Sequence, residues 1–258
     1  MDACLYDELY RVEQTHWWFR ARRHIVWSLV DRYMSDSASH RLSVCELGCG
    51  TGGNIACCAD RHDIVGVECS PHALAYARGT LGSRIRYGKL PGEIDLPPQS
   101  ADVVLMTDVL EHIEDDAGSA TVALRLLRPG GIVIATVPAY QWLYSPRDAH
   151  HHHCRRYGKQ QFAELWPRAE CKTELLSYYN TTLFPIAAAV RLGSKVFREH
   201  KNTGDLTLPP RWINQQLTRI MSCEVNLLGR MPMPFGLSLI AVLRKHANCA
   251  CEELQRAA

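Results

Sequence analysis

The sequence predicts an α/β protein built on a Rossmann-like, doubly wound sheet. A glycine-rich turn joins an apolar strand to a helix start at Leu42–Gly53. Further along, short apolar segments alternate with helical patterns, as in consecutive βα units. A last apolar segment, Gly236–Arg244, follows a long insertion and is expected to close the sheet.

Composition describes an ordinary globular protein. The chain has 258 residues, of which 47% are hydrophobic and 22% charged, with a net charge of +2. This charge argues against a dedicated nucleic-acid binder. No apolar stretch is long enough to span a bilayer, and the acidic start is unlike a signal peptide, so a cytoplasmic location is expected. The 11 cysteines include no Cys-x-x-Cys pair and are expected to be reduced thiols.

The turn at Gly48, Gly50 and Gly52 is the stretch around which the chain is organised. Glycine allows a sharp turn and brings backbone N–H groups close to a ligand. Glu46, two residues before the first glycine, would repel a pyrophosphate but suits a ligand that carries an ammonium group. The next strand, Asp63–Val67, ends at Glu68, where a doubly wound sheet places an acceptor for ribose hydroxyls.

The segment Val44–Gly52 resembles the first motif of the class I S-adenosylmethionine-dependent methyltransferases. Asp108–Ile113, after the strand Ala101–Met106, resembles the family's fourth-strand motif, and Leu126–Gly131 resembles the turn before its fifth strand. The resemblance implies a seven-stranded sheet with an antiparallel last strand, and S-adenosylmethionine as cofactor. The residues expected to bind the cofactor are Glu46, Gly48, Cys49, Gly50, Gly52, Glu68, Cys69, Asp108 and Val109.

Residues 1–40 precede the sheet and show helical spacing of apolar residues. Within them, Thr15–Arg23 is densely aromatic and basic, and it resembles a Trp-Trp-Phe-x-x-Arg-Arg segment in one subgroup of these methyltransferases. A helix packed on the main domain with solvated arginines would explain the pattern, and so would a lid over cofactor and substrate. We favour the lid, with substrate contacts from Trp17, Arg20, Arg22 and Arg23.

The segment Pro138–Tyr157 follows the fifth strand, so it is expected at the rim where ligands bind. Its second half resembles an Asp-x4-His-x-Arg-Arg-Tyr pattern of the same subgroup, which begins at Asp148. This makes His153 the first candidate for a catalytic base, and His112, after the fourth strand, the second. The residues of this segment expected to contact substrate are Tyr140, Arg155, Arg156 and Tyr157.

The run His150–His153 also raises the question of a metal site. Side chains alternate along an extended segment, so at most two of the four, such as His151 and His153, would face one ion. A third ligand would be Asp148 or a residue from elsewhere, such as His112. A metal site, a polar loop with one catalytic histidine and a purely structural loop remain open, and no metal is assigned.

The expected organisation is an N-terminal helical lid (1–40), a Rossmann-like domain (41–180 and 234–246), a helical insertion (181–233) and a tail (247–258). The insertion holds an apolar segment, Leu183–Val190, and a helix, Arg211–Leu228. It is expected to pack on the domain and roof the substrate; a membrane-surface contact is the alternative.

The sequence therefore predicts transfer of a methyl group to a small-molecule acceptor, at an oxygen of an anionic substrate. One alternative is an S-adenosylmethionine-binding enzyme that uses a histidine-bound metal, and another is a non-catalytic ligand-binding module of the same fold. RNA methylation is disfavoured because no Asn-Pro-Pro-Tyr motif occurs. A monomer and a homodimer are both compatible with the sequence, and the acceptor is not identified.

Overall fold

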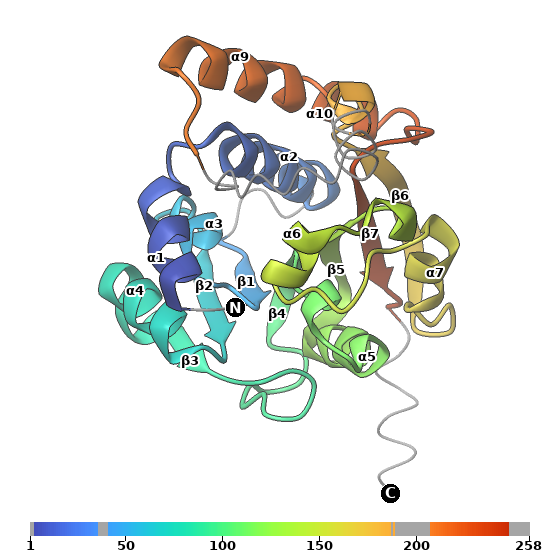
Figure 1. The fold of residues 1–258 in the computed structure, drawn as a ribbon. Helices are drawn as coiled ribbons and strands as arrows, with labels where there is room; N and C mark the ends of the chain where they lie inside the picture. The colour runs from blue at the N-terminus through green and yellow to red at the C-terminus, as the bar shows by residue number, and fades with distance from the viewer. Residues whose placement is uncertain (1–2, 36–40, 187, 189–206, 248–258) are drawn as a thin grey trace, which may run out of the picture.

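The structure, a computed structural model, describes residues 3–35, 41–186, 188 and 207–247 and is organised around one mixed sheet. The seven strands lie in the order β3-β2-β1-β4-β5-β7-β6, with helices on both faces (Figure 1). Strands β1 to β5 run parallel, and β7 lies antiparallel between β5 and β6. The predicted doubly wound sheet with an antiparallel last strand is confirmed.

The strands match the predicted apolar segments closely. They are β1 Ser43–Leu47, β2 Asp63–Glu68, β3 Ile85–Tyr87, β4 Ala101–Thr107, β5 Leu127–Pro138, β6 Cys171–Tyr179 and β7 Ser238–Lys245. The start of β5 differs from the prediction, which placed a helix end and a turn at Leu126–Gly131. Leu127 already pairs with Ala101, and the regular ladder resumes at Ile132 after an irregularity that contains Gly130 in a left-handed conformation.

Helices occur in residues 1–40, after the glycine turn and in the insertion, as predicted, with one break that the sequence pattern did not reveal. They are α1 Ala3–Val12, α2 Trp17–Tyr33, α3 Gly53–Ala56, α4 Pro71–Leu81, α5 Asp116–Leu126, α6 Pro146–His150, α7 Lys159–Glu164, α9 Arg211–Ser222 and α10 Val225–Leu228. Short 3-10 turns occur at η2 Gly82–Arg84, η3 Leu110–His112 and η4 Gln141–Leu143.

The single helix predicted over Arg211–Leu228 is wrong, because α9 ends before Cys223 and α10 begins after Glu224. The Glu224 carboxylate accepts hydrogen bonds from the backbone and hydroxyl of Thr182, which fixes the break. Residues 187, 189 and 190 of the apolar segment Leu183–Val190, and all of the tail beyond residue 247, lie outside the described residues. The described helices include none with the length and apolarity needed to cross a bilayer.

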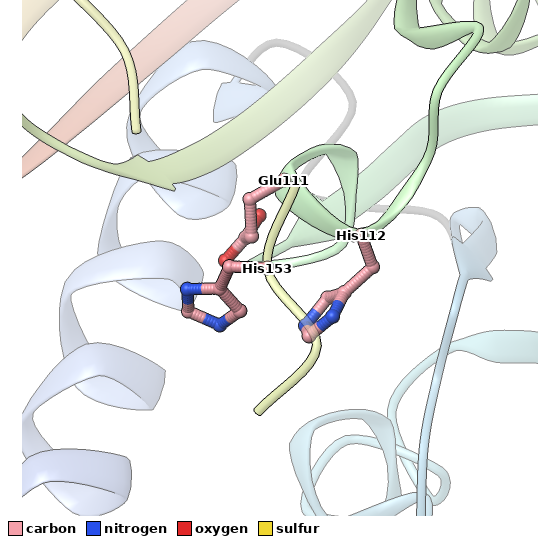
Figure 2. Close-up of side chains that lie close together, drawn as sticks. All are labelled: Glu111, His112 and His153. Carbon is pink, nitrogen blue, oxygen red and sulfur yellow. The ribbon is translucent and has the colours of Figure 1, made fainter. Parts of the chain in front are cut away.

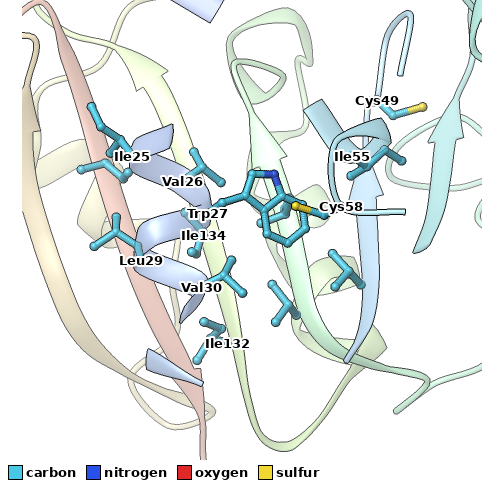
Figure 3. Close-up of a cluster of buried hydrophobic side chains, with 14 of the residues drawn as sticks. Ile25, Val26, Trp27, Leu29, Val30, Cys49, Ile55, Cys58, Ile132 and Ile134 are labelled. Atoms are coloured by element: carbon cyan, nitrogen blue, oxygen red, sulfur yellow. The ribbon is translucent and has the colours of Figure 1, made fainter. Parts of the chain in front are cut away.

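Alternating side chains of the central strands enter two separate cores, as expected for a sheet covered on both faces. Val103 and Leu105 of β4 join one core, whereas Val104 and Met106 join the other. Helix α2 fills the first core: Ile25, Val26, Leu29 and Val30 are fully buried, beside Ile132 and Ile134 of β5 (Figure 3). Helices α5 and α7 cover the second core.

Helix α9 of the insertion lies across α2 on the side away from the sheet (Figure 1). Buried Asn214 joins the two by its side chain: its oxygen accepts from the Trp17 N–H at 2.8 Å, and its amide donates to the Thr15 carbonyl at 2.8 Å. The insertion therefore fixes the turn between α1 and α2 although it lies almost 200 residues later in the chain. The domain boundaries themselves remain predictions.

Replacing Asn214 with Ala should destabilise the protein by about 1 to 2 kcal/mol, because two partly buried hydrogen bonds to the backbone of Thr15 and Trp17 are lost. Urea unfolding gives the change, and Gln215→Ala, an exposed position on the same helix, is the matched control. Equal stability of the two variants would contradict the role of Asn214 in holding the turn.

Candidate functional site

The site lies where the order of the strands reverses. The chain runs outward from β1 to β2 and β3 and then returns to β4, which lies on the other side of β1. Ligands bind outside the carboxyl ends of strands at such a switch point. A cavity of about 1250 Å³ opens there, lined by residues that follow β1, β2, β4 and β5 and by residues of α1 and α2.

The loops after β1 and β4 touch directly at the base of this cavity. Gly48 has φ +71°, and a Cβ at this position would lie 2.3 Å from Cγ2 of Val109. Any larger residue would force apart the two loops, so glycine is required for both conformation and space. Val109 and the neighbouring Asp108 thereby reach the cavity beside the glycine loop.

Glu68 connects the glycine loop to the end of β2. Its Oε2 accepts from the Gly50 N–H at 2.9 Å, while its Oε1 accepts from the N–H groups of Cys69 and Ser70. The carboxylate lines the cavity, as the ribose prediction requires, and it also has a structural role that the sequence did not show. Of the predicted cofactor residues, only Gly52 does not line the cavity; it serves as the left-handed N-cap of α3.

Glu46 is a buried acid at the base of the site. It is 1% exposed, and its Oε1 accepts from the Asn54 amide at 2.7 Å and the Thr107 hydroxyl at 2.8 Å. Its Oε2 accepts no hydrogen bond from any described residue. Burial raises the pKa of Glu46 to about 7. A buried carboxylate oxygen without a partner on the wall of a cavity favours a cationic ligand group.

A second buried acid, Glu13, attaches the N-terminal helices to the glycine loop. It accepts from the Thr51 hydroxyl at 2.7 Å and lies so close to Gly53 that a Cβ there would be 2.3 Å from its carboxylate. Burial raises the pKa of Glu13 above its ordinary value. Sequence reasoning missed Glu13, because a single acid in a helical segment looks like an ordinary solvated residue.

The aromatic and basic segment of α2 divides between the cavity and the surface. Trp17 and Arg22 line the cavity, and Arg22 forms an ion pair with Asp108. The structure does not bring the other two predicted arginines to the cavity: Arg20 is exposed, and Arg23 donates to the Gln14 side chain and the Glu13 carbonyl. Their predicted substrate contacts do not fit this geometry.

Two histidines and a glutamate meet at the rim, opposite the glycine loop. Glu111 and His112 come from η3, and His153 comes from the segment after α6 (Figure 2). The His112 and His153 ring centroids lie 4.6 Å apart, and all three residues line the cavity. Burial, reinforced by Asp108, raises the pKa of Glu111 well above its ordinary value; burial lowers the pKa of His112 to about 4.

Asp148 orients His153 from behind. Its Oδ1 lies 3.2 Å from Nδ1 of His153 and 2.6 Å from Nη2 of Arg156, and its Oδ2 accepts from Ser145. Burial alone would raise the pKa of Asp148, but the hydrogen bonds from His153 and Arg156 hold it well below the ordinary value. Asp148 and His151 do not form a ligand set with His153; the set is completed instead by Glu111 and His112.

Three predicted substrate residues lie away from the cavity. Tyr157 is fully buried and donates to Asp116, which also pairs with Arg155 at 2.6 Å. Tyr140 stacks on Tyr178 with 5.1 Å between the ring centroids. Direct substrate contacts from Tyr140, Arg155 and Tyr157 therefore do not fit the structure, because these side chains fix the loop instead. Arg156 does line the cavity, as does Arg147, which sequence reasoning did not single out.

The chain is similar in sequence to known methyltransferases. Residues 45–135 match the sequence model of a family described as a methyltransferase domain. A probable S-adenosylmethionine-dependent methyltransferase of Mycolicibacterium smegmatis is 29% identical over 168 residues, which cover 62% of each chain. A protein of the same description from Mycobacterium tuberculosis is 29% identical over 132 residues, covering 48% of this chain and 43% of the relative. The matched regions thus span less than two thirds of these relatives' lengths.

Solved structures share the fold at low sequence identity. An S-adenosylmethionine-dependent methyltransferase of Thermotoga maritima has a TM-score of 0.55 at 14% identity, over 93% of this chain and 94% of its own. A [4+2]-cyclase has a TM-score of 0.50 at 18% identity, covering 84% and 82%. A methyltransferase and a [4+2]-cyclase share this fold, so the function must be argued from the site.

Replacing Glu46 with Gln should stabilise the ligand-free protein, and the gain should depend on pH. The pKa of Glu46 is raised from 4.5 to about 7, so its ionisation costs folding stability as the pH rises through this range. Gln keeps an oxygen for Asn54 and Thr107 but has no charge to bury. The gain is on the order of 3 kcal/mol above pH 7 and disappears toward pH 4.5.

Denaturant unfolding of both proteins at about pH 5 and about pH 8 measures this difference. A gain of equal size at the two pH values, or destabilisation at the higher one, would contradict the burial of an uncompensated carboxylate at position 46.

Proposed function

We propose that the protein is an S-adenosylmethionine-dependent methyltransferase that acts on an oxygen of an anionic small molecule. The observation that carries the proposal is Glu46, which lines the cavity beside the glycine loop and holds a buried carboxylate oxygen without a hydrogen-bond partner among the described residues. The cofactor carries an ammonium group and a ribose, for which the cavity offers the carboxylates of Glu46 and Glu68. The matched family and relatives support the same activity.

The cofactor lies across the ends of β1, β2 and β4 in this proposal. The methionine part lies against Gly48 and Gly50, with its ammonium group near Glu46 and Asp108. The ribose hydroxyls bind Glu68, and Cys69 and Val109 form neighbouring walls. Helix α2 is attached to this region by the Arg22–Asp108 ion pair. Binding of the cofactor is therefore coupled to the packing of α2 over the cavity.

Methyl transfer itself needs little covalent chemistry from the protein. Bound S-adenosylmethionine would supply an electrophilic methyl carbon, activated by the sulfonium, for the acceptor oxygen to attack. The cavity contributes alignment and excludes water. The acceptor proton is removed at the cluster of Glu111, His112 and His153, with His153 as the first candidate and His112 as the second.

The proposal of an anionic acceptor rests on three arginines among the residues that line the cavity. Arg22 and Arg156 line the cavity, each with an aspartate partner, and Arg147 lines it beside the histidine segment. Trp17 and Leu217 add apolar surface from α2 and from α9 of the insertion. This combination suits a small molecule with an apolar body and a carboxylate or phosphate group.

Replacing Glu68 with Ala should weaken S-adenosylhomocysteine binding by about tenfold to hundredfold, because charged hydrogen bonds to the ribose are lost. Titration calorimetry measures the affinity. Glu93→Ala, an exposed acid on the neighbouring loop, is the control. The thermal midpoint must be recorded too, since Glu68 also accepts three backbone N–H groups. Unchanged affinity in a folded Glu68→Ala protein would refute the ribose contact.

Replacing His153 with Ala should lower turnover by roughly 10²-fold or more while leaving S-adenosylhomocysteine affinity unchanged. Turnover is followed as release of S-adenosylhomocysteine from S-adenosylmethionine, using the best acceptor from a panel of phenols and carboxylic acids. His150→Ala is the matched control, because His150 is exposed and does not line the cavity. Full turnover in the His153 variant would move the acceptor chemistry to another part of the cavity.

A further inference from the structure

The cluster of Glu111, His112 and His153 has the composition and spacing of a metal site. Each residue offers one ligand atom, and the three atoms lie within 4.8 Å of one another. Ligands of a six-coordinate ion are about 3 to 4 Å apart for bonds of about 2.1 Å, so small side-chain rotations would close the site. Figure 2 shows the carboxylate and the two rings converging from two segments of the chain.

Glu111 supplies a second and independent indication. Its side chain is 1% exposed, and its Oε2 accepts no hydrogen bond from any described residue. The backbone around it is held in place, since the Cys154 N–H donates to the Glu111 carbonyl at 2.7 Å. A rigidly held, buried carboxylate oxygen without a partner is a poor structural element but a good ligand for a cation.

Both imidazoles are oriented by partners behind them. Nδ1 of His153 lies 3.2 Å from Oδ1 of Asp148, which leaves Nε2 available, and Arg156 fixes that aspartate in turn. His112 hydrogen-bonds to the backbone of His152. Histidines that bind metals are held in this way: the second ring nitrogen bonds to a carboxylate or a carbonyl. A general base requires only one oriented histidine, whereas this cluster contains two, as a metal site does.

We propose that Glu111, His112 and His153 bind one divalent transition-metal ion, which holds the acceptor oxygen opposite the methyl donor. Two imidazoles and one carboxylate favour Mn²⁺, Fe²⁺, Co²⁺ or Zn²⁺ over Mg²⁺ or Ca²⁺, which prefer oxygen ligands. Three protein ligands leave further coordination positions open toward the cavity. A bidentate acceptor, such as a catechol or a hydroxy acid, fits those positions.

The role of the ion, but not its binding, rests on the proposed methyl transfer. The bound ion lowers the pKa of the acceptor hydroxyl, whose proton passes to solvent water. The resulting oxyanion forms a bond to the methyl carbon while the carbon–sulfur bond breaks. The bonding pair goes to sulfur, so the sulfonium becomes a neutral thioether and the ion keeps its oxidation state. With the ion bound, His112 and His153 act as its ligands, and the ion takes over the role of activating the acceptor that the proposed function gives to a histidine base.

Titration calorimetry of Mn²⁺ and Zn²⁺ into protein without an affinity tag, stripped with a chelator, tests the site. We expect one ion per chain, with affinity reduced more than about tenfold in His112→Ala, His153→Ala and Glu111→Gln. His150→Ala, in the same histidine run but outside the cavity, should bind as the unchanged protein does. If neither ion binds, the proposal is overturned. If metal affinity is lost in His150→Ala rather than in the three ligand variants, the proposal is overturned too, and the histidine run binds the ion adventitiously.

Electron paramagnetic resonance of the Mn²⁺ complex gives a readout that folding defects do not imitate. Couplings from two imidazole nitrogens should appear, and each single histidine variant should retain one. Couplings unchanged in both variants would overturn the ligand assignment. S-adenosylhomocysteine is titrated into the same stripped protein: binding without metal affinity refutes only the ion, whereas metal affinity without nucleoside binding refutes the proposed function.

Discussion

A buried carboxylate at the end of the central strand is the constraint on which the site depends. Glu46 lies on β1, which pairs with β2 on one side and β4 on the other, so the backbone cannot move away from the cavity. Asn54 and Thr107 satisfy one of its oxygens and leave the second without a partner among the described residues. The fold thus holds a charge that is costly without a ligand, as expected for a binding site under functional rather than structural selection.

The N-terminal helices and the insertion hold the residues around this site in place. Glu13, just after α1, contacts the glycine loop, and Arg22, on α2, contacts Asp108 at the end of β4. Asn214 then fixes the turn between these helices from the opposite end of the chain. Segments from both ends of the sequence therefore build one cavity, so a change far from the glycine loop can alter the packing of the lid over the ligand.

The fold could be predicted from the sequence because its signals are local. Glycines at Gly48 and Gly50 and the apolar runs around them specify strand, turn and helix without help from distant residues. The same spacing identified Glu46 and Glu68. Partners at long sequence separation could not be predicted. Asp116 accepts hydrogen bonds from Arg155 and Tyr157, about 40 residues later in the chain, and these bonds hold both side chains away from the cavity. The break between α9 and α10 likewise depends on Thr182 and left no signal in the apolar pattern.

The central claim, that Glu46 receives the cofactor's ammonium group, is tested most directly by proton release. At about pH 7 the free protein holds a proton on Glu46 in a substantial fraction of molecules, and a bound ammonium group would expel it. S-adenosylmethionine is titrated calorimetrically in buffers of different ionisation enthalpy. The account predicts that the binding enthalpy changes with buffer, showing net proton release, and that Glu46→Gln abolishes this dependence. Binding heat that is the same in every buffer, or no binding heat at all, would contradict it.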